Sequence, residues 1–152
     1  MNYLDSNFAA ALHFHIAGHT AIAEKYVRRT SRPFVFSELA ELECRRAFVV
    51  RTGSPDSENW QRLQQLLSGS VWLREPVRWD RLSAKAAELI DRYGTKLQAG
   101  TLDTLHVAQA LLSGCTWFLS FDSKSNARSL AAACRLKVFP QLSGAEKGRA
   151  FH

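Results

Sequence analysis

The 152-residue sequence predicts an α/β fold in which helices cover both faces of a mostly parallel, five-stranded sheet. Short apolar runs alternate with longer segments of helical period, which is typical of strands joined by crossover helices. These runs lack the polar alternation of half-exposed strands, as expected for parallel strands buried on both faces. The length fits one domain, and a hydrophobic content of 46% is sufficient for a core.

Five apolar segments are expected to form the strands, and turn residues separate each of them from the helical segment that follows. The predicted strands are residues 2–5, 32–36, 71–76, 116–121 and 136–140.

The segments between the strands have helical period and recognisable helix starts and ends. Ser37, Ser54 and Thr101 are expected to be N-caps, with Pro55 in the first helical position and Gly53 and Gly114 as helix ends. The predicted helices are residues 7–29, 38–51, 55–68, 78–97, 101–113 and 124–134.

The last ten residues are polar and contain glycine, so they are expected to form a loose C-terminal tail. The predicted division is therefore a single domain over 1–142 and a tail over 143–152.

Net charge and cysteine content restrict the class of protein. The formal net charge of +6 suits a polyanionic partner such as RNA, DNA or an acidic protein. Cys44, Cys115 and Cys134 are odd in number and form no metal-binding spacing, which indicates free thiols in a reducing cytoplasm. No leader peptide and no membrane span is expected.

Two predicted strands at opposite ends of the chain each finish on an Asp-Ser pair, "YLDS" and "LSFDS". In open α/β sheets, ligands bind outside the carboxyl ends of the strands. If the two strands are neighbours, Asp5 and Asp122 lie in the same site. Each acid alone is adequately explained as a loop acid or a helix cap, but two in matching contexts favour a shared site.

A third acid is expected on the buried side of a helix. Leu39, Leu42, Ala47 and Val50 are spaced as an apolar stripe, and Glu43 falls within it. A buried carboxylate is costly unless it is paired or bound to a cation. A salt bridge to Arg46, one turn away, is the structural alternative.

Asp103 is the fourth acid, in the first turn of a helix that is apolar around most of its circumference. The helix dipole alone would explain an acid at this position. The same position also places Asp103 beside Asp5 and Asp122.

Four converging carboxylates would repel one another unless a divalent cation lies between them. Oxygen ligands with no neighbouring His or Cys favour Mg²⁺ or Mn²⁺. Such a site binds phosphate oxygens and activates water for attack on a phosphodiester.

The motifs "YLDSN", "SELAELECRRAF", "LDTLHVAQAL" and "FLSFDSK", in this order and at this spacing, resemble the PIN domain. The resemblance is greatest to the single-domain ribonuclease toxins of bacterial toxin–antitoxin pairs, the VapC-like group. It implies a three-layer α/β/α sandwich and a Mg²⁺- or Mn²⁺-dependent endoribonuclease.

By position in these motifs, the resemblance gives Asp5, Glu43, Asp103 and Asp122 as the acidic, metal-binding set. Ser6 would orient Asp5 or a bound water, and Asn126 would be a weaker, supporting ligand. The resemblance also implies a homodimer, an RNA substrate and an antitoxin protein that inserts into the active site.

Other functions fit the sequence less well. A haloacid-dehalogenase-like phosphatase needs a second Asp where this chain has Asn7, and a response-regulator receiver needs an Asp at the third strand, where "VWLREP" has none. The main alternative is a catalytically silent PIN fold that acts as a binding module. The presence of all four acids argues against it.

Histidines are a second possible source of metal ligands. His15 and His19 are one helical turn apart and follow His13, but no Cys or Glu at suitable spacing completes a site, so all three are interpreted as ordinary helix residues. His106 lies one turn after Asp103 and is expected to orient the structure through a hydrogen bond. Trp60, Trp72 and Trp79 are expected to be core residues, with a dimer or antitoxin surface as the alternative for some of them.

Overall fold

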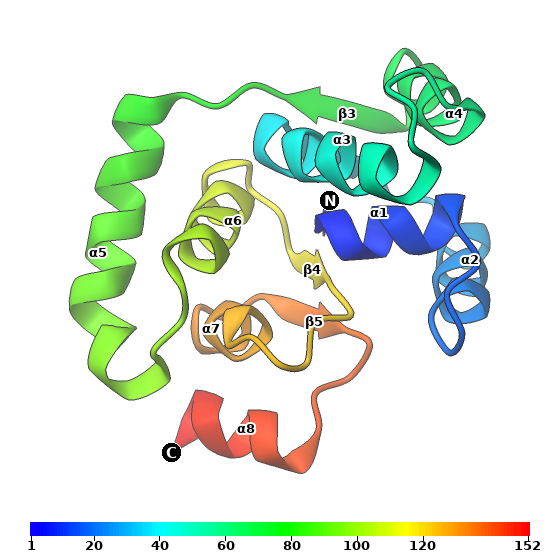
Figure 1. Ribbon diagram of the computed structural model, residues 1–152. Coiled ribbons are helices and arrows are strands. Elements are labelled where there is room, and N and C mark those ends of the chain that lie inside the picture. Colours follow the sequence, from blue (N-terminus) through cyan, green and yellow to red (C-terminus); the bar gives the residue numbers. More distant parts are fainter.

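The computed structural model describes all 152 residues and contains five strands and eight helices (Figure 1). The strands are β1 (Asn2–Leu4), β2 (Phe34–Ser37), β3 (Trp72–Glu75), β4 (Trp117–Leu119) and β5 (Lys137–Phe139). The helices are α1 (Ser6–His13), α2 (Thr20–Arg29), α3 (Glu38–Thr52), α4 (Glu58–Leu67), α5 (Trp79–Leu97), α6 (Thr101–Leu112), α7 (Ala127–Ala133) and α8 (Gly144–Phe151).

The strands form one sheet in the order β3-β2-β1-β4-β5, and every pair is parallel. The predicted five-stranded parallel sheet is therefore confirmed. In chain order, β2 and β3 are added on one side of β1, and β4 and β5 are then added on its other side. The direction of winding thus reverses between β1 and β4.

Alternate residues of the strands face two separate apolar clusters. Tyr3, Val35 and Phe118 pack against α5, α6 and α7, whereas Leu4 and Leu119 pack against α1 to α4. Figure 1 shows α5, α6 and α7 on one side of the sheet and α1, α2 and α4 on the other. The molecule is therefore the predicted three-layer α/β/α sandwich.

The single helix predicted over residues 7–29 is wrong, because the chain breaks between α1 and α2. Gly18 has φ +77°, a left-handed conformation that no α-helix passes through. The Thr20 hydroxyl accepts a hydrogen bond from the Ile16 N–H and donates one to the Phe14 carbonyl. These bonds replace the helical pattern across the break.

Two of the predicted helix starts are also wrong. Ser57, rather than Ser54, caps α4 by accepting the Trp60 N–H. Gly100, rather than Thr101, is the N-cap of α6. By contrast, Ser37 caps α3 as predicted, through the Ala40 N–H.

The prediction of a loose tail over 143–152 is wrong, because these residues contain α8. Ser143 and Glu146 form a capping box, in which each side chain accepts the other's backbone N–H. Glu146 and Ala150 are buried. The Ser-x-x-Glu spacing in "SGAE" is the sequence signal for this helix.

The tryptophans divide between core and surface. Trp72 is buried as predicted, but Trp79 is 60% exposed at the start of α5. Separately, no helix combines the length and the apolar composition that a bilayer crossing requires.

Candidate active site

The site lies at the carboxyl ends of the two central strands. β1 pairs in register with β4, Leu4 opposite Leu119, so Asp5 and the residues after Leu119 leave the sheet side by side. This is also where the winding reverses, the usual location of ligand sites in open parallel sheets. The adjacency expected for the Asp5 and Asp122 segments is therefore present.

Asp5 is buried and rigidly held. It is the N-cap of α1, with Oδ1 accepting the Ser6 N–H at 2.7 Å. Its other oxygen, Oδ2, accepts the Ser120 hydroxyl at 2.7 Å and the Asn7 amide at 2.9 Å. The Ser6 hydroxyl lies 3.5 Å from Oδ1, at the limit of a hydrogen bond. The carboxylate is thus fixed by two neighbours in sequence and one from the strand beside it.

Ser120 and Asn7 contribute to the site although the sequence did not predict it. The Asn7 Oδ1 accepts the Phe121 N–H at 2.8 Å, and its amide also contacts the Ser120 hydroxyl at 3.1 Å. These bonds join the start of α1 to the end of β4. A polar residue directly after each strand is the only sequence signal for this link.

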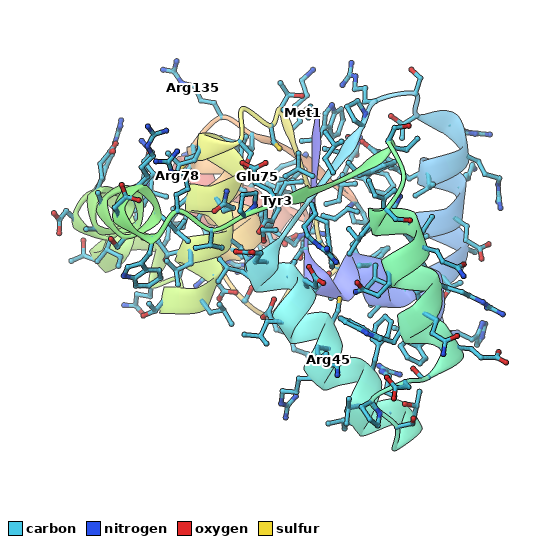
Figure 2. The ribbon with its side chains drawn as sticks, turned by 90° about the horizontal axis from the view of Figure 1, so that it is seen from above. Met1, Tyr3, Arg45, Glu75, Arg78 and Arg135 are labelled. Carbon is cyan, nitrogen blue, oxygen red and sulfur yellow. The ribbon has the colours of Figure 1, made fainter.

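Glu43 reaches the site from α3 and is held by His106 of α6. Its Oε2 lies 2.6 Å from the His106 Nε2. The other ring nitrogen, Nδ1, is 2.7 Å from the Tyr3 hydroxyl, which in turn lies 2.8 Å from the Ser37 hydroxyl. Figure 2 shows Tyr3 in the interior of the molecule. His106 therefore orients the structure through hydrogen bonds, as expected, and the partner of Glu43 is His106 rather than Arg46.

In the Glu43–His106 contact, each side chain shifts the pKa of the other toward its charged form. Burial is the largest influence on Glu43 and favours the neutral acid, but the hydrogen bond and charge of His106 outweigh it and lower the Glu43 pKa. Burial likewise opposes charge on His106, yet Glu43, Asp5 and Asp103 together raise the His106 pKa. Glu43 is therefore held as a carboxylate.

The apolar stripe predicted on α3 is wrong, although Glu43 does lie close to Asp5. Leu42 and Val50 of the supposed apolar stripe are 71% and 69% exposed. The buried face of α3 consists of Ala40, Cys44 and Phe48, each four residues apart. Glu43 lies at the border of that face, where a carboxylate can reach both protein and solvent. The prediction that no His lies nearby was wrong as well.

Asp103 is half-buried in the first turn of α6 and makes no ion pair. Burial is the main cause of its raised pKa, followed by the negative charges of Asp5 and Asp122. Burial and these two charges outweigh the opposing influence of His106, so the Asp103 pKa is raised.

Asp122 follows β4 by three residues, because the strand ends at Leu119 rather than at Phe121 as predicted. One oxygen, Oδ1, accepts the N–H groups of Lys124 and Ser125, both at 3.0 Å. No hydrogen bond involves Oδ2, so this oxygen is free to bind a ligand.

Asn126, expected as a supporting ligand, donates its amide to the Leu97 carbonyl at the end of α5. This bond joins the start of α7 to α5. Only its Oδ1 is left for a ligand or a water. The histidines of the first helical region do not converge, because the chain's only cluster of potential metal ligands is Asp5, Glu43 and His106.

Comparison with known proteins agrees with this arrangement. A family model described as the PIN domain matches residues 3–131. The chain belongs to the PIN domain family. All four acids lie within the matched residues. A comparison with curated protein sequences found no significant match.

Among solved structures, the PIN fold of this chain is similar to that of VapC20 from Mycobacterium tuberculosis, described as a sarcin–ricin loop cleaving toxin. The match has a TM-score of 0.68 and covers 88% of this chain and 95% of the other, at 19% sequence identity. At this identity the similarity establishes the fold.

A buried arginine connects the PIN-domain site to α8, which lies beyond the matched residues. The Arg128 guanidinium donates to the Ser120 carbonyl at 2.5 Å, to Glu146 Oε1 at 2.7 Å and to the Pro140 carbonyl at 2.9 Å. Its side chain is 5% exposed and that of Glu146 is 3% exposed. We call this the Arg128–Glu146 brace. It fixes the backbone of Ser120, whose hydroxyl contacts Asp5.

The donor set suits a hard divalent cation. The ligand atoms of Asp5, Glu43 and His106 lie within 4.8 Å of one another, and the charges of Asp5 and Asp122 act on Asp103. Both nitrogens of His106 are engaged in hydrogen bonds, so the available ligands are carboxylate oxygens, which Mg²⁺ and Mn²⁺ prefer. A divalent cation would balance the negative charge that raises the Asp103 pKa.

Proposed function

We propose that this PIN-domain chain is an endoribonuclease that depends on Mg²⁺ or Mn²⁺ and hydrolyses RNA phosphodiester bonds. One observation carries the proposal: in a chain of this family, ligand atoms of Asp5, Glu43 and His106 lie within 4.8 Å of one another at the reversal point of the sheet, and burial together with the charges of Asp5 and Asp122 raises the Asp103 pKa. Asp5, Glu43, Asp103 and Asp122 would hold the ion. The ion, when bound, supplies activation of water and neutralisation of phosphate charge.

The protein residues have separable tasks in this proposal. Asp5 is pre-oriented by Ser6, Asn7 and Ser120, so that binding an ion costs little reordering. His106 keeps Glu43 ionised and aimed into the site. Asp103, which makes no ion pair, and Asp122 Oδ2, which accepts no hydrogen bond, would complete the oxygen ligands.

The test is RNA cleavage by purified protein in Mg²⁺, in Mn²⁺ and in EDTA, with wild type beside Asp103→Asn. We expect cleavage only with metal, and a loss of about 100-fold or more in the variant. Asp80→Asn is the matched control, because Asp80 is also a first-turn helix acid but is exposed and far along the chain from the site. Equal cleavage by all three proteins would identify the activity as contamination.

A catalytically silent binding module is the second candidate. It predicts that folded wild type binds RNA but leaves it intact in both metals. The ligand set argues against it, since none of the four acids is replaced by a neutral residue.

The same proposal includes a role as the toxin of a toxin–antitoxin pair, acting on cytoplasmic RNA as a homodimer that an acidic antitoxin inhibits. The structural similarity to VapC20 and the net charge of +6 support it. Induced expression should arrest growth and produce mapped RNA cuts, and co-expression of a small adjacent upstream reading frame should relieve both. Normal growth with intact RNA would contradict the toxin role.

A further inference from the structure

The amino edge of the sheet, opposite the carboxylates, carries a hollow of about 380 Å³ between the end of α2, the loop into β2 and the start of β4. We call it the amino-edge hollow. Its lining residues are Tyr26, Arg29, Thr30, Ser31, Arg32 and Trp117.

The polar side chains of this hollow are mostly hydrogen-bond donors. Arg29 and Arg32 supply guanidinium groups, and Thr30 and Ser31 supply hydroxyls. No carboxylate lines the hollow, so its chemistry suits an anion with several acceptor oxygens.

The positive charge here is not neutralised by the protein. Neither Arg29 nor Arg32 makes an ion pair, whereas the adjacent Arg28 pairs with Glu24 at 3.7 Å. The Lys137 ammonium lies 5.6 Å from the centre of the Trp117 ring and adds to the charge. The last turn of α2 carries partial negative charge, so the side chains and not the helix dipole supply the attraction.

The loop that carries Arg32 is fixed before any ligand binds. The Asn2 N–H donates to the Pro33 carbonyl at 3.0 Å, and the Asn2 amide reaches the Arg32 carbonyl at 3.4 Å. The Asn2 Oδ1 in turn accepts the Tyr26 hydroxyl at 2.7 Å. A pre-ordered loop lowers the entropy cost of binding.

We propose that the amino-edge hollow binds a backbone phosphate of the RNA substrate, at a point remote from the scissile bond. This inference rests on the proposed ribonuclease function. Four carboxylates repel RNA, so attraction for the polyanion has to come from cationic groups elsewhere on the surface. The guanidinium groups of Arg29 and Arg32, which make no ion pair, supply this attraction.

The position of the hollow implies a folded or long substrate. Asn2 is paired with Trp117, and Asp5 lies three residues further along the strand direction, about 10 Å at the rise of a β-strand. An RNA that reaches both edges has to extend around the molecule. Figure 2 shows Met1 at one side of the molecule and Arg45, on α3, at the opposite side.

The test is binding of a fluorescently labelled 20-nucleotide oligoadenylate, measured by anisotropy in EDTA at several salt concentrations. EDTA prevents both cleavage and metal-bridged contacts. The variant is Arg29→Ala/Arg32→Ala, two exposed side chains whose loss leaves the core intact. The control is Arg28→Ala/Arg62→Ala, which removes the same charge from two arginines that are paired with Glu24 and Glu58.

We expect the variant to bind about tenfold more weakly and to lower the slope of log affinity against log salt by about 0.7, the value for one lost phosphate contact on a single strand. The control should change both quantities much less.

Equal weakening by variant and control would overturn the proposal in favour of non-specific attraction to net charge. Displacement of the RNA by an oligoglutamate peptide at lower charge concentration would overturn it in favour of an acidic protein segment. Because this assay needs no cleavage, a failure of the ribonuclease proposal appears separately, as tight RNA binding without metal-dependent cuts.

Discussion

The carboxyl edge of the sheet and its amino edge differ in the sign of their charge. At the carboxyl edge, Asp103 lies near Asp5 and Asp122, and the one nearby cation, His106, is committed to Glu43. At the amino edge, Arg29 and Arg32 line a hollow without any acid. The carboxylates at the carboxyl edge are therefore not fully balanced by cations, and the arginines at the amino edge are not balanced by acids.

This difference shows how one small sheet could hold a polyanion against an acidic site. Parallel strands place all their carboxyl ends together, so acids that follow β1 and β4 meet. Residues that precede the strands meet at the opposite edge. A metal cation bound at the carboxyl edge would balance the carboxylates. RNA phosphates bound at the amino edge would balance the arginines.

The largest expected effect concerns the Arg128–Glu146 brace behind the carboxyl edge. Arg128→Ala leaves the Glu146 carboxylate buried without a partner and removes donors from the Ser120 and Pro140 carbonyls. We expect a loss of roughly 3–5 kcal/mol in the free energy of unfolding, measured by urea titration.

Arg149→Ala is the control for this variant, because Arg149 is exposed on α8. It should change the free energy of unfolding by less than about 0.5 kcal/mol. Similar effects from both arginines would show that α8 contributes little to the order of the carboxyl edge.

The next effect separates stability from function at the same edge. Without metal, Asp103→Asn should raise the melting temperature by roughly 2–4 °C, because it removes a charge that burial, Asp5 and Asp122 disfavour. With Mn²⁺, wild type should gain stability and the variant should gain much less.

Asp80→Asn again provides the comparison, and it should neither raise the melting temperature in EDTA nor alter the response to Mn²⁺. If Asp103→Asn destabilises the metal-free protein, then the carboxyl edge is not short of positive charge.

A smaller effect follows from pH and tests whether the brace is ionic. Burial favours neutral Glu146, but the Ser143 N–H and the Arg128 charge outweigh it, so the Glu146 pKa lies below its usual 4.5. A lowered pKa stabilises the fold above pH 4.5, and this contribution is lost as pH falls through the folded-state pKa. The stability difference between wild type and Glu146→Gln should therefore shrink on acidification below pH 4.5. A constant difference down to pH 3 would mean that the pair acts through packing and not through charge.

The smallest effect belongs to the rim of the amino-edge hollow. Lys137→Ala should weaken oligoadenylate binding about two- to threefold and lower the salt slope by at most about 0.7. Lys147→Ala, an exposed lysine on α8, should have less effect on binding. A larger loss from Lys147 than from Lys137 would place the RNA on a different surface.

The sheet and the acids were predictable because their signals are local. Continuous apolar runs such as "FVF" and "TWFLS" indicate buried strands, and an acid directly after such a run falls at the edge of the sheet. Asp5 and Asp122 were found in this way. Helix boundaries were less predictable, since the break at Gly18 and the start of α4 depend on which of several competing polar groups caps the backbone.

Three contacts of the site could not be predicted because they join residues far apart in the chain. Glu43 and His106 are 63 positions apart, Asp5 and Ser120 are 115 apart, and Arg128 meets Glu146 only because α8 folds back against α7. The spacing of residues within one segment does not indicate which side chains of another segment will contact it.

The sequence alone thus determined which segments become strands and that acids follow two of them, because backbone preference and burial act over a few residues. Only the tertiary structure decided that His106, and not Arg46, pairs with Glu43. It also decided that the last ten residues form a helix that supports the site instead of a loose tail. Those outcomes depend on the distances between packed helices and strands, because a buried charged side chain pairs with whichever partner lies within hydrogen-bond distance.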